Sequence, residues 1–472
     1  MDIPSRTMLS GLLLTACALP AWAAVPPAIK TVSHVHSAYS AHHAPDMLAT
    51  LQLARQKGIA AVIFADDASA TFEYGLRPLR NLIKKTVAFN SVLRAGPEVY
   101  LKNIASLRRR FPDMVIIPGV EAAPFYYWTG DPLKGLVMHN WNRHLSVAGL
   151  ERAEDYRGLP VLGNPRAAVW RWSSLWPLAL LALSLWAGRA GWRKAAWAWS
   201  AAGLIFIADA FPFHQPSWSP YDSTAGWKPY EALASYADRP DLLCFWNHPE
   251  ASSWSTPQDV GLKVKAVTAP YPEALALVPQ TDGFAALWEG HRTMTAPGGA
   301  WDQALRSYLK GARRKPPWAF GELDYGGASA NGVGLDDVYM DVHASSRTMA
   351  GVLESLKKGR FESIAKDAGR TVELIEWSVS SAGACASSGE TLPDASAPQV
   401  RIALAPVGAP ALPATITLLR NGFVIFKETQ TLPWSRTVPD DPEELKRFYY
   451  RLDVRFGPNG VLLSNPIFAQ RP

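Results

Sequence analysis

The stretch TVSHVHSAYSAHHAPD, residues 31–46, places four of the chain's ten histidines within one predicted strand and the turn that follows it. His34 and His36 are two residues apart, so alternation along a strand directs both side chains to the same face. Two imidazoles on one face can chelate a single metal ion, and His42 or His43 in the turn can reach back toward them. This HxH pattern predicts a metal site at the end of the first strand.

Further imidazole and carboxylate side chains follow the later predicted strands. They are Asp67 after IFAD, Glu121 at the end of PGVE, His139 and His144 on or after the fourth strand, His248 after CFWN and Asp324 after FGEL, with Glu322 as a weak substitute ligand. In a parallel barrel the catalytic groups gather at the carboxyl ends of the strands. Nitrogen and oxygen ligands of this kind suit zinc, manganese or iron.

Apolar strand-like segments alternate with helical patterns over most of the chain, as in AAVIFADD, DMVIIPGVEAAP and DLLCFWNHP. The segment APDMLATLQLARQKG has Pro45 at an early helical position and Gly58 at its end, which is the usual punctuation of a helix. This alternation predicts an α/β fold built on a β/α barrel. After about residue 370, short alternating strands predict a small antiparallel β-sandwich.

Two apolar segments of roughly 15–20 residues lie mid-chain on either side of GRAGWRK, near the lower bound for a membrane span. Tryptophans flank both segments, and the connecting loop carries Arg189, Arg193 and Lys194. We expect a transmembrane helical hairpin whose basic loop is cytoplasmic. The alternative is a pair of buried core helices.

The first residues are typical of an export signal, with Arg6, an apolar run and the small-residue stretch AWAA. Cleavage after Ala23 is one interpretation, and a lipoprotein form modified at Cys17 is the other. Together with the hairpin, the signal predicts an inner-membrane protein whose catalytic domain lies in the periplasm.

The chain has 472 residues and a net charge of +6, and its basic residues are scattered along the sequence. Scattered lysines and arginines are more typical of a solvated surface than of a nucleic-acid interface. No recognition helix, zinc finger or stacking motif accompanies them, so we expect no nucleic-acid partner.

The ordered set HVH, PGVE, NHP and ELDY resembles the polymerase and histidinol phosphatase (PHP) superfamily of metal-dependent hydrolases. The later GVLESLKKGRF is similar to the helix and turn that close such domains. The resemblance spans most of residues 30–370, apart from the hairpin. It implies a distorted seven-stranded β/α barrel with two or three divalent metal ions, and phosphate-ester hydrolysis.

The resemblance also implies the role of each residue. The first metal would bind His34, His36, Glu121 and Asp324, and Glu121 would bridge to a second metal. His248 would hold that second metal, together with His144 or His139. We favour His144, because HLSVAGL looks more like the family's strand at that point.

A third metal would take His42 and Asp67, and Asp67 and Glu121 are the candidate catalytic groups. Two departures from the family pattern fall on this third site. The chain has ADD where the family commonly has TDH, and DYG where the family commonly has DxH, so Asp67 and Gly326 replace imidazoles. A carboxylate in place of an imidazole favours a harder ion such as manganese.

The function expected from these residues is hydrolysis of a small-molecule or lipid-linked phosphate ester by a metal-activated water. The alternatives are a non-catalytic metal- or ligand-binding envelope protein on a partly degenerate barrel, and a non-phosphate hydrolase that uses the same metals. The predicted organisation is a signal peptide at 1–24, barrel segments at 25–168 and 214–370, a transmembrane hairpin at 169–213 and a β-sandwich at 371–472.

Overall fold

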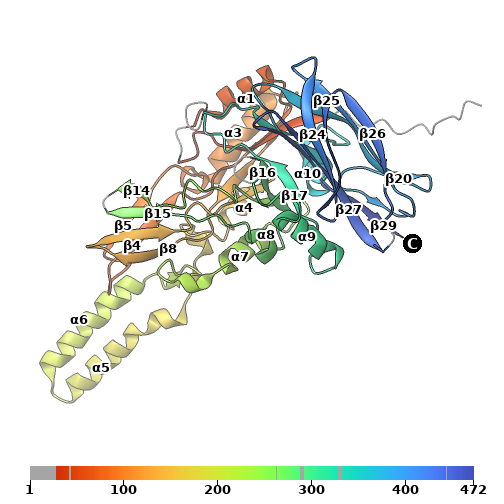
Figure 1. Cartoon of the computed structure of the whole chain (residues 1–472). Helices are drawn as coiled ribbons and strands as arrows, with labels where there is room; N and C mark the ends of the chain where they lie inside the picture. The colour runs from red at the N-terminus through yellow and green to blue at the C-terminus, as the bar shows by residue number, and fades with distance from the viewer. Residues whose placement is uncertain are drawn as a thin grey trace, which may run out of the picture.

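A computed structural model describes residues 28–41, 44–261, 263–287, 292–327, 332–442 and 444–471. The predicted signal peptide lies outside the described residues. Two large β-sheets dominate the fold, and one hydrophobic core runs through both of them. Figure 1 shows the C-terminal strands at one end of the molecule and a pair of helices projecting from the opposite end.

The larger sheet has eleven strands and draws them from both ends of the chain. Its order is β22 (Thr391–Leu392), β29 (Ile467–Gln470), β27 (Arg447–Phe456), β28 (Gly460–Ser464), β19 (Phe361–Ala365), β18 (Val338–Val342), β1 (Ile29–Val35), β2 (Ala61–Phe64) and β6 (Val115–Ile117). In addition, β24 (Leu412–Arg420) pairs with β27 and with β25 (Phe423–Leu432). Strands β1, β2 and β6 are mutually parallel, and β18, β19 and β28 are antiparallel to their neighbours.

The second sheet has six strands and carries most of the predicted site residues at one edge. Its order is β17 (Trp318–Gly321), β16 (Gly283–Leu287), β13 (Leu243–Trp246), β10 (Leu145–Ala148), β7 (Gly119–Ala122) and β3 (Asp66–Asp67). Strand β10 is antiparallel to both β7 and β13. The amino end of β10 therefore lies at the same edge as the carboxyl ends of β7 and β13.

Four smaller sheets complete the β-structure. They are β4 (Thr71–Gly75) with β5 (Lys84–Ala88); β14 (Gln258–Gly261), β15 (Val264–Val267), β9 (Gly135–His139) and β8 (Tyr127–Asp131); β11 (Val169–Trp170) with β12 (His214–Gln215); and β21 (Ala384–Ala386), β20 (Thr371–Ser381), β23 (Gln399–Val407) and β26 (Trp434–Pro439).

Helices cover the sheets and connect many of their strands. They are α1 (Met47–Gln56), α2 (Val92–Ala95), α3 (Pro97–Arg110), α4 (Ala153–Arg157), α7 (Lys228–Tyr236), α8 (Ala274–Leu277), α9 (Ala300–Leu309) and α10 (Met349–Lys357). Asp46 caps α1 by accepting a hydrogen bond from Ala49 N, so Pro45 precedes the helix instead of lying inside it. Thr348 caps α10 in the same way, through Gly351 N.

The predicted seven-stranded barrel interrupted by a membrane hairpin is wrong. No sheet closes into a barrel among the described strands, and two of the segments predicted as single strands each divide between two different sheets. VIIPGVEA divides at Pro118 into β6 of the larger sheet and β7 of the smaller one. Proline lacks the N–H that a continuous ladder needs. Residues 61–67 divide similarly into β2 and β3 at Ala65.

The predicted transmembrane hairpin forms two antiparallel helices, α5 (Pro177–Arg189) and α6 (Arg193–Ala210), which project from the body of the molecule (Figure 1). Within the described residues, no helix combines the length and apolar character needed to span a bilayer, so that prediction is wrong. The 13 residues of α5 extend about 20 Å, against about 30 Å of hydrocarbon. Nor are these core helices, since Trp186 and Trp197 are largely exposed.

The C-terminal strands do not stand apart as the small sandwich that the sequence predicts. Strand β19 pairs with β28 across the predicted boundary near residue 370, with Glu362 opposite Ser464 and Ala365 opposite Val461. One sheet and one hydrophobic core therefore run from the N-terminal strands into the C-terminal strands. The six-stranded sheet, which carries most of the predicted site residues, packs on this same hydrophobic core.

Candidate metal centre

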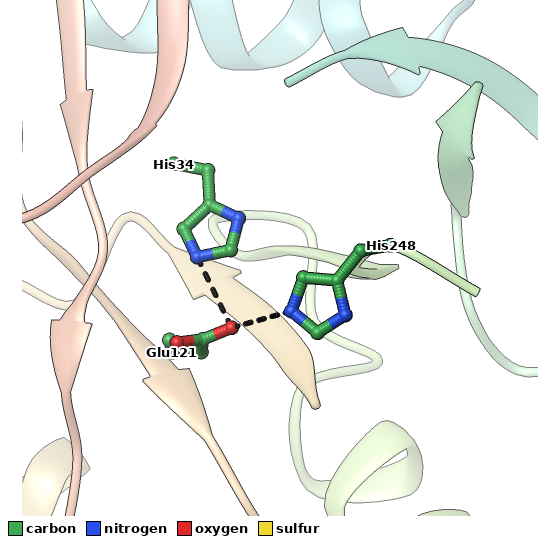
Figure 2. A group of neighbouring side chains, drawn as sticks. All are labelled: His34, Glu121 and His248. Carbon is green, nitrogen blue, oxygen red and sulfur yellow. Dashed lines mark hydrogen bonds and ion pairs between the residues drawn. The ribbon is translucent and has the colours of Figure 1, made fainter. Parts of the chain in front are cut away.

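The Glu121 carboxylate lies at the centre of a buried group of imidazoles. Its Oε1 atom is 3.1 Å from His34 Nε2, 3.2 Å from His248 Nε2 and 2.6 Å from His144 Nδ1. Figure 2 shows His34 and His248 converging on this oxygen from two sides. The other oxygen, Oε2, is 3.6 Å from His36 Nε2. The two oxygens of one carboxylate therefore face two different sets of side chains.

His34 and His36 come together at the end of β1, with ring centroids 5.0 Å apart. Simple strand alternation does not account for this, because β1 has an irregular register between Val32 and Val35, and His34 has a φ of 58°. A non-glycine residue in the left-handed region carries a strain that the surrounding structure must support. The local departure from regular β-structure sets the direction of the His34 ring.

Each of these two rings is held through its Nδ1 atom. His34 Nδ1 donates to Glu322 Oε2 at 2.5 Å. His36 Nδ1 lies 2.7 Å from Ser40 Oγ, and Ser40 in turn donates to the buried Asp66 carboxylate at 2.9 Å. Metal-binding histidines commonly anchor one ring nitrogen in this way, which directs the other nitrogen at the ion. In both residues Nε2 is the atom that faces Glu121 and Asp324 at the centre of the cluster.

Asp324 completes the His34 and His36 side of the cluster. Its Oδ1 is 3.1 Å from His36 Nε2 and 3.6 Å from His34 Nε2. Backbone hydrogen bonds from Tyr325 N to His34 O and from His36 N to Tyr325 O fix this segment beside β1. Asp324 also has a positive φ, of 47°.

His248 follows β13 and has a φ of 29°, so it is the third residue of the cluster with a positive φ. Its backbone N–H donates to Glu322 Oε1 at 2.8 Å, and its Nδ1 lies 3.4 Å from the Tyr271 hydroxyl. The preceding Asn247 donates from its side chain to Glu121 Oε1 at 2.9 Å. Glu322 therefore positions two histidines from different strands.

The structure separates the two alternatives for the fourth histidine by position. His144, at the amino end of β10, contacts Glu121, and its ring lies 5.4 Å from that of His248. His139 ends β9 in a different sheet, stacks on Tyr127 and has its Nε2 2.7 Å from Thr129 Oγ1. Because β10 is antiparallel, the residue that reaches the shared edge precedes this strand instead of following it.

The residues predicted to bind a third metal, His42 and Asp67, do not form a described group of neighbouring ligand atoms like those around Glu121 and Asp324. His42 lies outside the described residues. Asp67 stands opposite Glu121 in the parallel β3–β7 register, but its Oδ2 accepts a hydrogen bond from Ala41 N at 2.8 Å. Asp67 is in neither of the described groups of ligand atoms that are close enough to share an ion. Its predicted metal and catalytic roles stay predictions.

The electrostatics of the cluster follow from three carboxylates, those of Glu121, Glu322 and Asp324, that face four imidazoles. Burial alone lowers the pKa of His34, but Glu121, Glu322 and Asp324 outweigh it and raise that pKa well above its ordinary value. For His36 burial is again outweighed, by Asp324 and Glu121, and the pKa rises to about 9. Burial raises the pKa of Glu121, but His144 and His34 more than offset it and hold it well below its usual range.

The donor set fits a divalent metal. Ligand atoms of His34, Glu121 and His248 lie within 4.8 Å of one another, and so do those of His34, His36 and Asp324. His34 Nε2 is buried and makes no hydrogen bond of acceptable geometry within the described residues. The carboxylates that raise the imidazole pKa values would attract a cation equally well. Imidazole nitrogens and carboxylate oxygens suit zinc, manganese or iron.

Two carboxylates that support the cluster, Glu322 and Asp66, were not singled out as main contributors by the strand-end pattern. Glu322 is more than a weak substitute ligand, because it orients both His34 and His248. Asp66 is fully buried and accepts from Ser37 and Ser40, whereas the neighbouring Asp67 was the residue that the pattern selected. The adjacent acidic pair at 66–67 and the serines at 37 and 40 were visible in the sequence, but only the tertiary contacts distinguish their roles.

No family model and no curated protein matches the chain. Two solved structures show local likeness. An engineered protein shares 15% identity and a TM-score of 0.15, over 22% of this chain and 21% of that chain. A DUF3823 family protein from Bacteroides ovatus shares 13% identity and a TM-score of 0.14, over 21% of this chain and 56% of that chain. Scores this low carry no argument about fold or activity.

Proposed function

We propose that the chain is a metal-dependent phosphoesterase with at least two divalent ions at the Glu121 cluster. The observation that carries this proposal is the convergence of four histidines on the two oxygens of the buried Glu121, namely His34, His36, His144 and His248. Asp324 lies against His36 and His34 on one side of this group. A carboxylate that presents one oxygen to each of two ligand sets is suited to bridge two ions. The order of motifs that resembles the PHP superfamily supports the same proposal.

Bound metal would supply a Lewis acid and a water of lowered pKa. The protein's part is to hold the ligands. Glu322 and the Ser40–Asp66 pair keep the Nε2 atoms of His34 and His36 directed inward. Asn247 fixes the Glu121 carboxylate in its orientation by donating to Oε1. In this proposal Asp67, opposite Glu121 in the β3–β7 register, would orient a water or accept a proton.

The test uses purified full-length protein, stripped with a chelator and reloaded with zinc or manganese. We expect two or more ions per chain by elemental analysis, and hydrolysis of a generic phosphate ester such as p-nitrophenyl phosphate. A His34→Ala/His36→Ala variant should lose both properties. His139→Ala is the matched control, because His139 lies in a different sheet, and it should keep both.

Less than one ion per chain after reloading, or equal losses in the His139 control, would contradict the metal assignment. Tight metal binding with hydrolysis of an anilide but of no phosphate ester would identify a non-phosphate hydrolase. Tight metal binding without hydrolysis of either substrate would indicate a non-catalytic metal-binding protein.

A further inference from the structure

A second site lies in the small sheets and shares no residue with the metal cluster. It is an apolar cavity of about 450 Å³ between the β4–β5 hairpin and the sheet that contains β8, β9 and β15. Its walls include Phe72, Tyr74, Val87, Trp128, Leu136 and Val264. Protein cavities that bind small ligands commonly have about 300–1,000 Å³ and aromatic or aliphatic walls of this kind.

The walls are built as an apolar surface. Trp128 Nε1 donates inside the wall to Glu73 O at 2.9 Å, so the indole presents its carbon atoms and not its N–H. Phe72 and Tyr74 pack against Trp128, with ring centroids 6.3 and 5.5 Å from it. These residues belong to a hydrophobic cluster of their own, separate from the main core.

The mouth of the cavity combines exposed apolar side chains with positive charge. Leu76 and Ile83 line the cavity and are 44% and 50% exposed. Lys84 and Lys85 also line it, and none of the described residues that line it is acidic. Lys84 lies 2.7 Å from Glu73, whereas Lys85 makes no ion pair within the described part of the chain. An apolar interior beneath a cationic rim fits a ligand with an alkyl chain and an anionic head.

We propose that this cavity binds a single-chain amphiphile with an anionic head group, namely a long-chain alkyl carboxylate or alkyl phosphate. The chain lies against Phe72, Trp128 and Leu136, and the head group meets Lys84 and Lys85 at the mouth. Burying Leu76 and Ile83 against the chain removes apolar surface from water, which supplies the main driving force. The site does not depend on the phosphoesterase proposal.

Isothermal titration calorimetry of the full chain, stripped of metal with a chelator so that no phosphate ester is hydrolysed, tests this with four ligands below their micelle concentrations. These are dodecanoate, dodecyl phosphate, dodecanol and dodecyltrimethylammonium. We expect the two anions to bind with a negative heat-capacity change, dodecanol to bind more weakly, and the cation to bind weakest. The ratio of the two anion affinities identifies which head group the site takes.

Variants locate the binding. Ile83→Asp and Leu76→Asp change exposed side chains and should each weaken the anions about tenfold or more, since a buried aliphatic side chain contributes about 1.5–3 kcal/mol. Leu133→Asp, at a position that is 82% exposed and outside the cavity, is the matched control and should change nothing. Lys84→Gln/Lys85→Gln should weaken both anions and leave dodecanol unchanged.

Three results would overturn the proposal. They are absent binding of both anions, equal binding of the cationic amphiphile, and an equal loss in the Leu133→Asp control. Circular dichroism of each variant establishes that the fold is retained.

Discussion

Glu121 and Asp302 are both buried carboxylates, yet the protein surrounds them in opposite ways. Asp302, in α9, accepts two hydrogen bonds from Arg451, at 2.7 and 2.6 Å, one from the Tyr449 hydroxyl and one from Gly298 N. Glu121 is surrounded instead by imidazoles and the amide of Asn247. Arg451 therefore links the C-terminal β27 to α9.

The difference lies in whether the positive partner can be exchanged. A guanidinium stays charged at every pH that the folded protein meets, so the Asp302 pair is a permanent structural contact. An imidazole can give up its proton, and its nitrogen then becomes a metal ligand. The Glu121 cluster can therefore replace protons with a divalent cation, which the Asp302 pair cannot do. Glu121→Gln and Arg451→Met test this contrast directly, and the later variants extend it to other positions.

Glu121→Gln should have the largest effect on function. It keeps the shape of the side chain but removes the charge that the two ligand sets share. Loss of several kcal/mol of transition-state stabilisation lowers kcat/KM about 1,000-fold. The measurement is phosphate-ester hydrolysis together with metal content by elemental analysis. Retained activity with a full complement of metal would show that Glu121 is not the bridging ligand.

Arg451→Met should have the largest effect on stability and none on metal content. It leaves the Asp302 carboxylate buried without its charged partner, which costs about 3–5 kcal/mol in the free energy of unfolding. Urea denaturation followed by circular dichroism measures this loss. Adding Asp302→Leu removes the remaining charge and should restore much of the stability. If the single variant loses metal while it stays folded, the two clusters are coupled and the contrast fails.

Asp341, in β18, forms no ion pair with an arginine or a histidine among the described residues. Its contribution to the free energy of unfolding should therefore depend on pH. Burial, with help from Glu362, raises the pKa of Asp341 from 3.8 to about 6. The folded state then prefers the protonated acid, so stability falls as the pH rises from about 4 to about 6. Above pH 6, Asp341→Asn should stabilise the protein by at most about 3 kcal/mol, and below pH 4 the gain should vanish.

Asp336→Asn is the control of opposite sign for that pH series. Burial favours a raised pKa at Asp336, but its contact with Lys366 outweighs this and lowers it. The ionised carboxylate therefore stabilises the fold at neutral pH, and that contribution is lost as the pH falls. Chemical denaturation at pH 4 and pH 8 distinguishes the two variants. The same sign of change in both at pH 8 would contradict the assignment.

Gly326→His should have the smallest effect, a rise of up to one ion in metal stoichiometry. It places an imidazole two residues after Asp324, where the family pattern has one. The φ of Gly326 is not positive, so a side chain there meets no backbone penalty of that kind. Gly327→His is the control. Its φ is 104° and its Cβ would lie 3.1 Å from Pro45 Cδ, so it should destabilise the protein without adding metal. Three tightly bound ions in the unaltered protein would refute the idea of a weakened third site.

The sequence predicted which candidate ligands lie close together better than it predicted the fold. His34 and His36 were selected as a pair on one strand, and Glu121, His248 and Asp324 as residues at or after strand ends. The structure brings the side chains of all five together, and metal binding by them stays a prediction. The choice between His139 and His144 stayed open, because it depends on β10 running antiparallel. The periodicity of apolar residues in a sequence does not indicate whether a strand runs parallel or antiparallel to its neighbours. Glu322 was undervalued, because its importance comes from reaching His34 and His248, which are distant in sequence.

The sequence by itself determined which residues are apolar and which side chains have the chemistry of metal ligands, because these properties reside in short segments. Tertiary structure alone decided which sheet each half-strand joins. Pro118 and Ala65 divide two predicted strands between different sheets, and β19 pairs with β28 across the predicted domain boundary. Such pairings are set by long-range packing against a shared core. No local pattern carries that information, and so the site residues were visible where the barrel and the membrane hairpin were not.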